Sequence, residues 1–221
     1  MPTMTTEDYV IALNTLRDEG VRAIPARVAE RTGVSAPTVT LALRRLERDG
    51  YIVWTGRREI ELTRQGLELA ESLMRRHRLV ERWLTDVLGL DWAAAHEEAH
   101  RLEHAISPIV EQRLLELMNF PTTCPHGNPI PGIAGERPPS VRLAGLPVGT
   151  RARLFRISEI AESERELMLW YFDQGFRPEI ELEVLAGTPE AVEVLVAGHQ
   201  VRLSRRAAEF LWMHEPEPTP V

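Results

Sequence analysis

The sequence contains no lysine, a single cysteine and no long run of apolar residues. One cysteine, Cys124, excludes an intramolecular disulfide framework and is typical of a protein in a reducing cytoplasm. No segment approaches the roughly 18 consecutive apolar residues of a membrane-spanning helix. The N-terminus also lacks the basic and apolar regions of a secretion signal. We therefore expect a globular, cytoplasmic protein that has no membrane partner.

Because lysine is absent, all 26 basic residues are arginines. The planar guanidinium group forms better bidentate contacts with phosphate than an ammonium group does. The net charge of −7 does not by itself suggest a nucleic-acid partner. However, residues 1–60 contain nine arginines against eight acidic residues, so the acidic excess lies downstream. The distribution of charge is therefore more informative than its sum.

The N-terminal part has the pattern of a winged helix-turn-helix. An apolar stripe predicts a first helix over residues 5–18. The segments IPARVAERTG and APTVTLALRRLERDG predict two further helices, each with proline in its first turn and glycine at its end. The β-rich runs YIVW and EIELT follow, joined by the tight basic turn at residues 55–58. Helix, turn, helix and hairpin is the order of elements in that fold.

Further helices are expected at about residues 64–88, 92–104 and 107–118, and their many apolar positions indicate a helical dimer interface. The next segment is rich in proline and glycine, which indicates an ordered loop and then a linker. Runs such as RARLFRI and AVEVLV then alternate with period two, with one short helix near residues 164–173, and predict a small SH3-like β-barrel.

The expected fold is thus mainly helical with a small β component. The expected parts are a winged helix-turn-helix DNA-binding domain (1–63), a helical metal-binding and dimerisation domain (64–133), a linker (134–149) and an SH3-like domain (150–216).

The second helix of a helix-turn-helix enters the major groove, where its first turns reach the base edges. The side chains there are short and include no arginine or asparagine for a bidentate base contact. The expected groove-facing residues are Ser35, Ala36, Pro37, Thr38, Thr40 and Leu41. The expected phosphate contacts are Arg27, Arg44, Arg45, Arg57 and Arg58. A solvated helix face explains any one of these arginines equally well, but it does not explain the whole arrangement.

Histidine is strongly clustered. Five of the seven histidines lie within fifty residues: His77, His96, His100, His104 and His126. At helical spacing, residues 96, 100, 103 and 104 project from one face. His77 and Glu81 form a second pair, one turn apart on the preceding helix. Imidazole and carboxylate together suit Mn, Fe, Co, Ni or Zn ions.

The segment from His96 to His100 also matches HExxH, the motif of zinc peptidases, with Glu97 as the general base. The motif is short and occurs by chance. A peptidase needs a third ligand at the spacing of its family, and the RLEH that follows does not provide it. An upstream DNA-reading domain has no place in a peptidase either. A zinc peptidase therefore stays only as a remote alternative, and we do not expect an enzyme.

With these residues in view, the chain resembles the diphtheria toxin repressor family, which includes iron-dependent and manganese-transport regulators. The likeness covers nearly the whole chain. It runs through TTEDY, IPARVAERTGVSAPTVTLALRRLERDGYIV, MRRHRLVERWLTDVLGL, HEEAHRLEH, GNPIPG and the C-terminal barrel. The combination of HRLxERxLxDxxGL with ExxHRLEH is highly specific. The resemblance implies a homodimeric repressor that binds a palindromic operator and uses two metal sites per subunit.

The resemblance also assigns ligands. The primary site would consist of Asp8, His100, Glu103 and His104. The ancillary site would consist of His77, Glu81, His96 and Glu164, with Cys124 and His126 as candidate further ligands through the CPHG segment. Some relatives have a second polar ligand where this chain has Leu167, and Glu166 is a weak substitute. Arg78 and Asn128 match residues that hold an anion beside the ancillary site in some members.

Two residues bear on the metal. Iron-sensing relatives have a thioether at the position of Asp8 and a thiol at that of His100. A carboxylate is a harder ligand and favours Mn(II), whereas an imidazole also accepts Fe(II) or Zn(II). We expect a Mn(II)-activated repressor of metal-uptake genes, with an Fe(II)-responsive repressor as the alternative. A constitutive DNA-binding protein whose metals are only structural is a further alternative.

Overall fold

The computed structural model describes residues 6–216, apart from the side chain of Arg57. The chain divides into two compact units, Met1–Arg76 and His77–Val221. The boundary falls inside the longest helix, α4 (Arg64–Asp86). No helix in the described part of the chain is long and apolar enough to cross a membrane.

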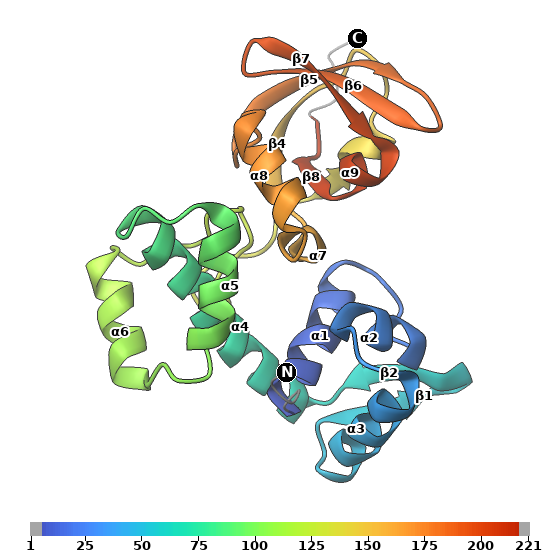
Figure 1. Ribbon diagram of the computed structural model, residues 1–221, viewed down its shortest axis with the longest axis vertical. Helices are drawn as coiled ribbons and strands as arrows, with labels where there is room; N and C mark the ends of the chain where they lie inside the picture. The colour runs from blue at the N-terminus through green and yellow to red at the C-terminus, as the bar shows by residue number, and fades with distance from the viewer. Residues whose placement is uncertain (1–5, 217–221) are drawn as a thin grey trace. The chain divides into compact units, whose positions relative to one another are not determined.

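The first unit contains the expected helix-turn-helix and hairpin (Figure 1). Its elements are α1 (Thr6–Asp18), α2 (Pro25–Thr32), α3 (Ala36–Arg48), β1 (Ile52–Thr55), the 3₁₀ turn η1 (Gly56–Arg58) and β2 (Glu59–Leu62). Gly33 ends α2 with a φ of 65°, a conformation that costs glycine little. Val39, Leu43 and Leu46 recur at helical spacing and are the buried face of α3. The predicted winged helix is therefore confirmed.

The second unit begins with a helical layer formed by the end of α4, α5 (Trp92–Leu102) and α6 (Pro108–Leu117). Asp91 caps α5, because its carboxylate accepts a hydrogen bond from the amide of Ala94 at 2.8 Å. Leu79, Val80 and Ala95 are among the fully buried residues between these helices. This packing fixes the faces of α4 and α5 that carry the histidines.

The rest of the second unit is a small β-structure with short helices (Figure 1). Its elements are β3 (Ser140–Arg142), η2 (Leu143–Gly145), β4 (Arg151–Ile157), α7 (Glu159–Glu162), α8 (Arg165–Asp173), β5 (Glu181–Gly187), β6 (Ala191–Val196), β7 (His199–Ser204), α9 (Arg205–Glu209) and β8 (Leu211–His214). Within the described residues, the strands form an antiparallel sheet in the order β3-β8-β4-β5-β6-β7. This sheet is consistent with the expected SH3-like domain.

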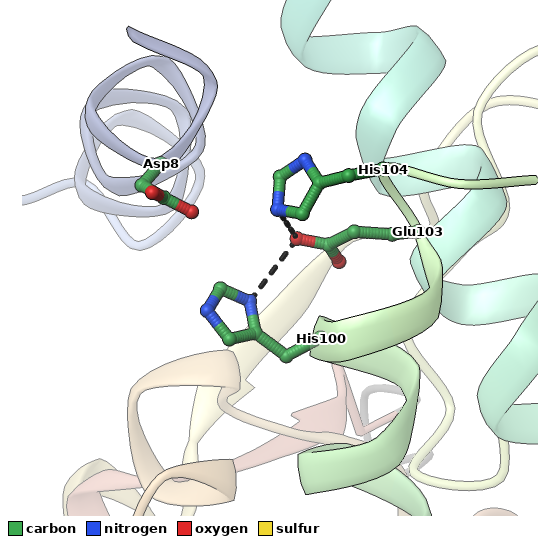
Figure 2. Close-up of side chains that lie close together, drawn as sticks. All are labelled: Asp8, His100, Glu103 and His104. Carbon is green, nitrogen blue, oxygen red and sulfur yellow. Dashed lines mark hydrogen bonds and ion pairs between the residues drawn. The ribbon is translucent and has the colours of Figure 1, made fainter. Parts of the chain in front are cut away.

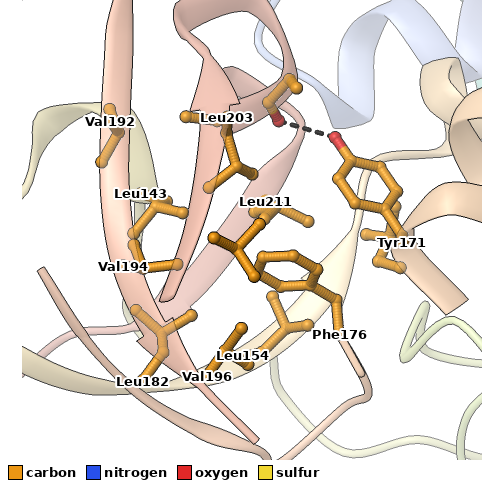
Figure 3. Close-up of a cluster of buried hydrophobic side chains, with 14 of the residues drawn as sticks. Leu143, Leu154, Tyr171, Phe176, Leu182, Val192, Val194, Val196, Leu203 and Leu211 are labelled. Atoms are coloured by element: carbon orange, nitrogen blue, oxygen red, sulfur yellow. Dashed lines mark hydrogen bonds between the residues drawn. The ribbon is translucent and has the colours of Figure 1, made fainter. Parts of the chain in front are cut away.

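Alternating apolar residues of the strands line one core, into which α8 inserts Tyr171 (Figure 3). Leu154 of β4 and Val194 of β6 are fully buried in it, as is Phe176. The Tyr171 hydroxyl donates a hydrogen bond of 2.7 Å to the carbonyl of Ala207, which satisfies the polar end of a buried ring. Ala161 of α7 and Met168 of α8 are buried in the same core, which positions both helices after β4.

The β-structure differs from the expectation at its edges. The segment assigned to a linker contributes β3, which pairs with β8, and the buried side chain of Leu143. Neither short strand was predicted, because three or four residues are too few to show a period. The helix α7 was also missed. It lies between β4 and the one helix that was predicted here, and it carries part of the site described next.

Candidate metal centre

Helices α4 and α5 bring His77, Glu81 and His96 together, as their spacing indicates. His77 Nε2 lies 3.0 Å from Glu81 Oε1, and His96 Nδ1 lies 2.9 Å from the same oxygen. His77 and Glu81 are buried, and the side chain of His96 is 16% exposed. One carboxylate oxygen therefore serves two imidazoles inside the protein.

The carboxylate that joins them from the β-structure belongs to Glu162, on α7, and not to Glu164. Glu162 Oε2 lies 3.4 Å from His96 Nδ1. Glu164 instead makes two hydrogen bonds, of 2.6 and 2.8 Å, with the guanidinium of Arg206. Ser158 caps α7 by accepting from the amide of Ile160, which turns Glu162 inward. A four-residue helix rich in glutamate gives no apolar signal of burial, so sequence reasoning missed it.

Glu166 and Leu167 also lie outside this group. Glu166 is exposed on α8, and Leu167 packs against the barrel core.

The CPHG segment supplies two more donors, and Gly127 explains how it reaches the centre. A Cβ atom on Gly127 would lie 2.3 Å from the carbonyl oxygen of Phe155, so only glycine lets this loop pack against β4. The carbonyl of His126 then accepts a hydrogen bond of 2.9 Å from the amide of Ile157. Cys124 and His126 are fully buried as a result.

His77, Glu81, His96, Cys124, His126 and Glu162 are called the buried centre below. They fall into two overlapping groups whose donor atoms lie within 4.8 Å of one another: His77, Glu81, His96 and Glu162, and Glu81, Cys124, His126 and Glu162.

The two residues that the resemblance assigns to an anion contact carboxylates of the chain itself. The Arg78 guanidinium donates to Glu159 Oε2 and to the carbonyl of Pro129, each at 2.5 Å. Asn128 Nδ2 donates to Glu162 Oε1 at 2.7 Å. Arg78 therefore has the carboxylate of Glu159 as an anionic partner, and Asn128 orients a member of the buried centre.

A second cluster consists of His100, Glu103 and His104 at the end of α5 and is called the Glu103 cluster (Figure 2). His100 Nδ1 lies 3.1 Å and His104 Nε2 lies 3.2 Å from Glu103 Oε1. The other oxygen of Glu103 accepts from His77 Nδ1 at 2.6 Å. Glu103 therefore connects this cluster directly to the buried centre. Asp8, also drawn in Figure 2, belongs to α1 of the first unit.

The electrostatics of the buried centre are set by carboxylates and imidazoles that lie close together away from solvent. Burial lowers the pKa of His96, but the nearby carboxylates of Glu162 and Glu81 outweigh burial and raise it to about 9. Burial and the charge of Glu81 raise the pKa of Glu162, but His126 and His96 outweigh them and lower it to about 2. At neutral pH the carboxylates are therefore ionised, and protonated imidazoles compensate their charge.

The unused donor atoms fit a metal better than a purely structural network. Within the described residues neither nitrogen of His126 makes a hydrogen bond, although Nδ1 lies 3.0 Å from Glu162 Oε1 as an ion pair, and neither Glu81 Oε2 nor Glu162 Oε2 makes a hydrogen bond. Buried polar atoms without partners are costly. Imidazole, carboxylate and thiol are also the groups that bind borderline divalent ions. The residues present therefore fit a divalent metal ion.

The peptidase alternative disagrees with this geometry. His96 faces Glu81 and Glu162, whereas His100 faces Glu103, so the two histidines of HExxH do not share a group. Glu97, the general base of that motif, forms an exposed ion pair with Arg165. A catalytic zinc needs both histidines and an open position.

The candidate DNA-reading face is open in the structure. The side chains expected to face the groove and the two arginines of α3 are all exposed: Ser35, Ala36, Pro37, Thr38, Thr40, Leu41, Arg44 and Arg45. Ser35 and Thr38 share a hydrogen bond of 2.9 Å, and Thr40 donates to the carbonyl of Ala36. Arg27 and Arg58 are also exposed, and the side chain of Arg57 lies outside the described residues.

Comparison with known proteins decides the family. Residues 1–60 match the iron dependent repressor N-terminal DNA binding domain, and residues 63–132 match the iron dependent repressor metal binding and dimerisation domain. The chain is 40% identical over 207 residues to the iron-dependent repressor IdeR of Mycobacterium tuberculosis, covering 89% of this chain and 90% of that protein. It belongs to the diphtheria toxin repressor family. The diphtheria toxin repressor of Corynebacterium diphtheriae is 37% identical over 190 residues, covering 82% of this chain and 84% of that protein.

Solved structures of the family agree with the whole fold. A manganese-dependent transcriptional repressor in complex with manganese superposes with a TM-score of 0.87 at 31% identity, covering 95% of this chain and 99% of that chain. ScaR with bound Zn²⁺ has a TM-score of 0.81 at 26% identity over 95% and 99% of the two chains. As a member of the diphtheria toxin repressor family, this chain is a metal-dependent transcriptional repressor, and that family is not a class of enzymes.

Proposed function

We propose that this chain represses metal-uptake genes when Mn(II) binds to it and increases its affinity for a palindromic operator. The buried centre carries the proposal, because its orphan donors and ionised carboxylates are suited to a divalent cation. The match to a metal-binding domain and the manganese-bound neighbour support it.

Asp8 is the residue that we propose connects metal to DNA. It is an acidic residue in the first turn of α1, on the unit that carries the DNA-reading helix. We propose that it completes the primary site with His100, Glu103 and His104. A bound divalent ion supplies the positive charge that offsets these carboxylates. Asp8 then fixes α1, and with it α3, in the arrangement that fits DNA, and the two binding events strengthen each other reciprocally.

Glu103 gives the two metal sites a direct link. Its Oε2 orients the Nδ1 side of the His77 ring, so that His77 Nε2 points at Glu81. Its Oε1 meanwhile faces His100 and His104. Occupation of one site therefore fixes a residue of the other, and we expect the two sites to fill cooperatively.

The dimer required for a palindromic operator has a suitable surface on α6. Ile109 is 77% exposed and Leu117 is 64% exposed on this helix. Val87 and Leu88, just after α4, are each more than half exposed. Apolar patches of this kind mark interaction surfaces. We propose that a second copy of the chain covers this one, which sets the spacing of the two recognition helices.

Mn(II) is the preferred ion because of Asp8. Its carboxylate is a hard ligand, and the other donors of the proposed primary site are one carboxylate and two imidazoles. This set contains no sulfur to favour Fe(II). Because some relatives are iron-dependent repressors, an Fe(II)-responsive repressor is the alternative.

A gel-shift titration on palindromic promoter DNA tests the proposal. The full-length protein should bind the DNA more tightly in Mn(II) than in chelator. Equal binding in both would contradict the proposal and favour a constitutive DNA-binding protein whose metals are only structural. Substituting Asp8→Met should shift the activation order toward Fe(II) or Co(II). An unchanged order would contradict the role of the Asp8 oxygen.

A further inference from the structure

The first residue of α5 packs into the barrel and not into its own layer. Trp92 is 3% exposed and belongs to the buried apolar cluster formed by the inward-facing residues of the strands. The core of the helical layer is a separate cluster, which contains Leu79 and Ala95. Asp91 caps α5 directly before Trp92, which fixes the point where the indole ring leaves the helix. Trp92 therefore joins the helical layer to the barrel.

Two side chains of the barrel pack around the indole ring. The ring of Phe172, on α8, meets the Trp92 ring edge to face, with 5.2 Å between the ring centres. The guanidinium carbon of Arg177 lies 3.7 Å from the centre of the Phe172 ring and 5.1 Å from that of Trp92. Arg177 also donates a hydrogen bond of 2.8 Å to the carbonyl of Phe172. Trp92, Phe172 and Arg177 are called the Trp92 clasp below.

The same indole ring supports the CPHG loop. The rings of Trp92 and His126 are nearly perpendicular, at 87°, and their centres lie 4.9 Å apart. His126 is fully buried, and its carbonyl accepts a hydrogen bond from the amide of Ile157 at the end of β4. One residue of α5 therefore contacts both the barrel and the loop that packs on the barrel.

A second contact between α5 and α8 is an ion pair at the surface. Glu97, the glutamate of the HExxH match, lies 3.2 Å from Arg165, and each side chain is about half exposed. Ion pairs exposed to this degree contribute little to stability, because water screens them. A buried tryptophan, in contrast, removes a large apolar area from water. The Trp92 clasp therefore dominates the contact between α5 and α8, and it contains no group that needs a metal ion.

We propose that Trp92 is a positioning residue that keeps the barrel docked on α5 in the metal-free protein. Docking places α7, and Glu162 with it, beside the histidines before an ion arrives. No metal affinity is then lost to a population of undocked molecules. The consequence for metal affinity rests on the proposed metal-sensing function, whereas the docking itself does not.

Fluorine NMR of the full-length protein tests the docking. The protein is labelled with fluorotryptophan, and spectra in water and in D₂O are compared, first with chelator and then with Zn(II). The resonance that is missing from Trp92→Phe belongs to Trp92. Because the ring is buried in the docked protein, this resonance should show no solvent isotope shift in either condition. A solvent isotope shift of the Trp92 resonance in chelator would overturn the proposal.

Phe172→Ala opens the clasp from the side of the barrel and leaves α5 unchanged. Phe172 is 39% exposed, so its loss should not unfold the barrel. The Trp92 resonance of this variant should show a solvent isotope shift in chelator, and Zn(II) should remove the shift, because the ion now has to dock the barrel. Glu97→Gln is the matched control across the same two helices and should behave like the wild type. A Phe172→Ala spectrum without the shift, or a Glu97→Gln spectrum with it, would contradict the role of the clasp.

Metal affinity shows whether docking positions the buried centre. Trp92→Ala should bind Mn(II) about 10- to 100-fold more weakly than the wild type, the usual effect of losing a group that orients a metal ligand. Trp92→Phe should recover most of the affinity, since a phenyl ring can still pack against Phe172. Circular dichroism in chelator establishes that the variants are folded, and Phe172→Ala replaces Trp92→Ala if the latter is not.

Equal Mn(II) affinities of the wild type and the folded Trp92→Ala or Phe172→Ala variant would overturn the positioning role. A wild type that binds no Mn(II) would defeat the proposed function, and the Trp92 resonance in chelator would still decide whether the clasp docks the barrel.

Discussion

The metal affinity of the buried centre should depend steeply on pH, because imidazoles must lose protons before they bind an ion. Burial lowers the pKa of His96, yet Glu162 and Glu81 raise it to about 9 in the metal-free protein. The pKa of His77 is also raised well above its usual value, since the effect of burial is outweighed by Glu81 and Glu103. The His96 imidazole is therefore protonated at neutral pH, and the pKa of His77 is shifted in the same direction.

The size of the effect follows from His96. With a pKa of about 9, the neutral ring is a roughly 1% fraction at pH 7 and a tenfold larger fraction at pH 8. The affinity should therefore rise about tenfold over that unit, or about 1.4 kcal/mol, from the His96 proton alone. Release of a proton from His77 makes the dependence steeper.

Free Mn(II) measured by its EPR signal gives this affinity directly. The titration is made at pH 6.5, 7, 7.5 and 8 on the His104→Ala variant, which weakens the Glu103 cluster and so leaves the buried centre as the main site. A wild-type titration serves as the control for this substitution. An affinity that changes by less than about twofold between pH 7 and pH 8 would refute the assignment of protonated imidazoles to the centre.

Three further outcomes follow from the same structure. The pKa of His96 is higher in the folded protein than in the unfolded chain, so its protonation adds up to about 3 kcal/mol to the free energy of unfolding; this contribution is full below about pH 6.5 and is lost as pH rises through 9. The melting temperature of the metal-free protein should therefore fall between pH 6.5 and pH 9, and a rise would contradict this. Ile109→Asp should convert the dimer to a monomer in sedimentation, whereas Val148→Asp, at an apolar residue that is also exposed, should not. A dimer that persists in Ile109→Asp would exclude α6 as the interface. Arg45→Ala should weaken binding to operator DNA and to random DNA alike, and should reduce the slope of the logarithm of the binding constant against the logarithm of salt concentration by about one. An unchanged slope would exclude a phosphate contact by Arg45.

Local patterns predicted most of the helices and several of the donors. The spacing of Val39, Leu43 and Leu46 marks the buried face of α3, and the one-turn spacing of His77 and Glu81 places them on one face of α4. Such periods depend only on helix geometry, so they can be recognised in the sequence without the tertiary structure.

The meeting of distant segments could not be predicted in this way. Glu162 reaches His96 because β4 ends at a capped four-residue helix, and because Gly127 lets the CPHG loop lie against β4. Neither event leaves a period in the sequence. Glu164, the expected ligand, lies only two residues further on, but it faces Arg206. Glu162 is the last residue of α7, whereas Glu164 caps α8, so a turn between two short helices separates the expected glutamate from the one that lies beside His96.

The central claim is that metal occupancy controls DNA binding through Asp8, and fluorescence anisotropy on one palindromic operator tests it most directly. Wild type and Asp8→Ala are each titrated at saturating Mn(II) and in chelator. Mn(II) should tighten wild-type binding by about 5- to 150-fold, the usual range of allosteric coupling, and should leave Asp8→Ala near its chelator value. Equal tightening of both proteins, or of neither, would contradict the claim.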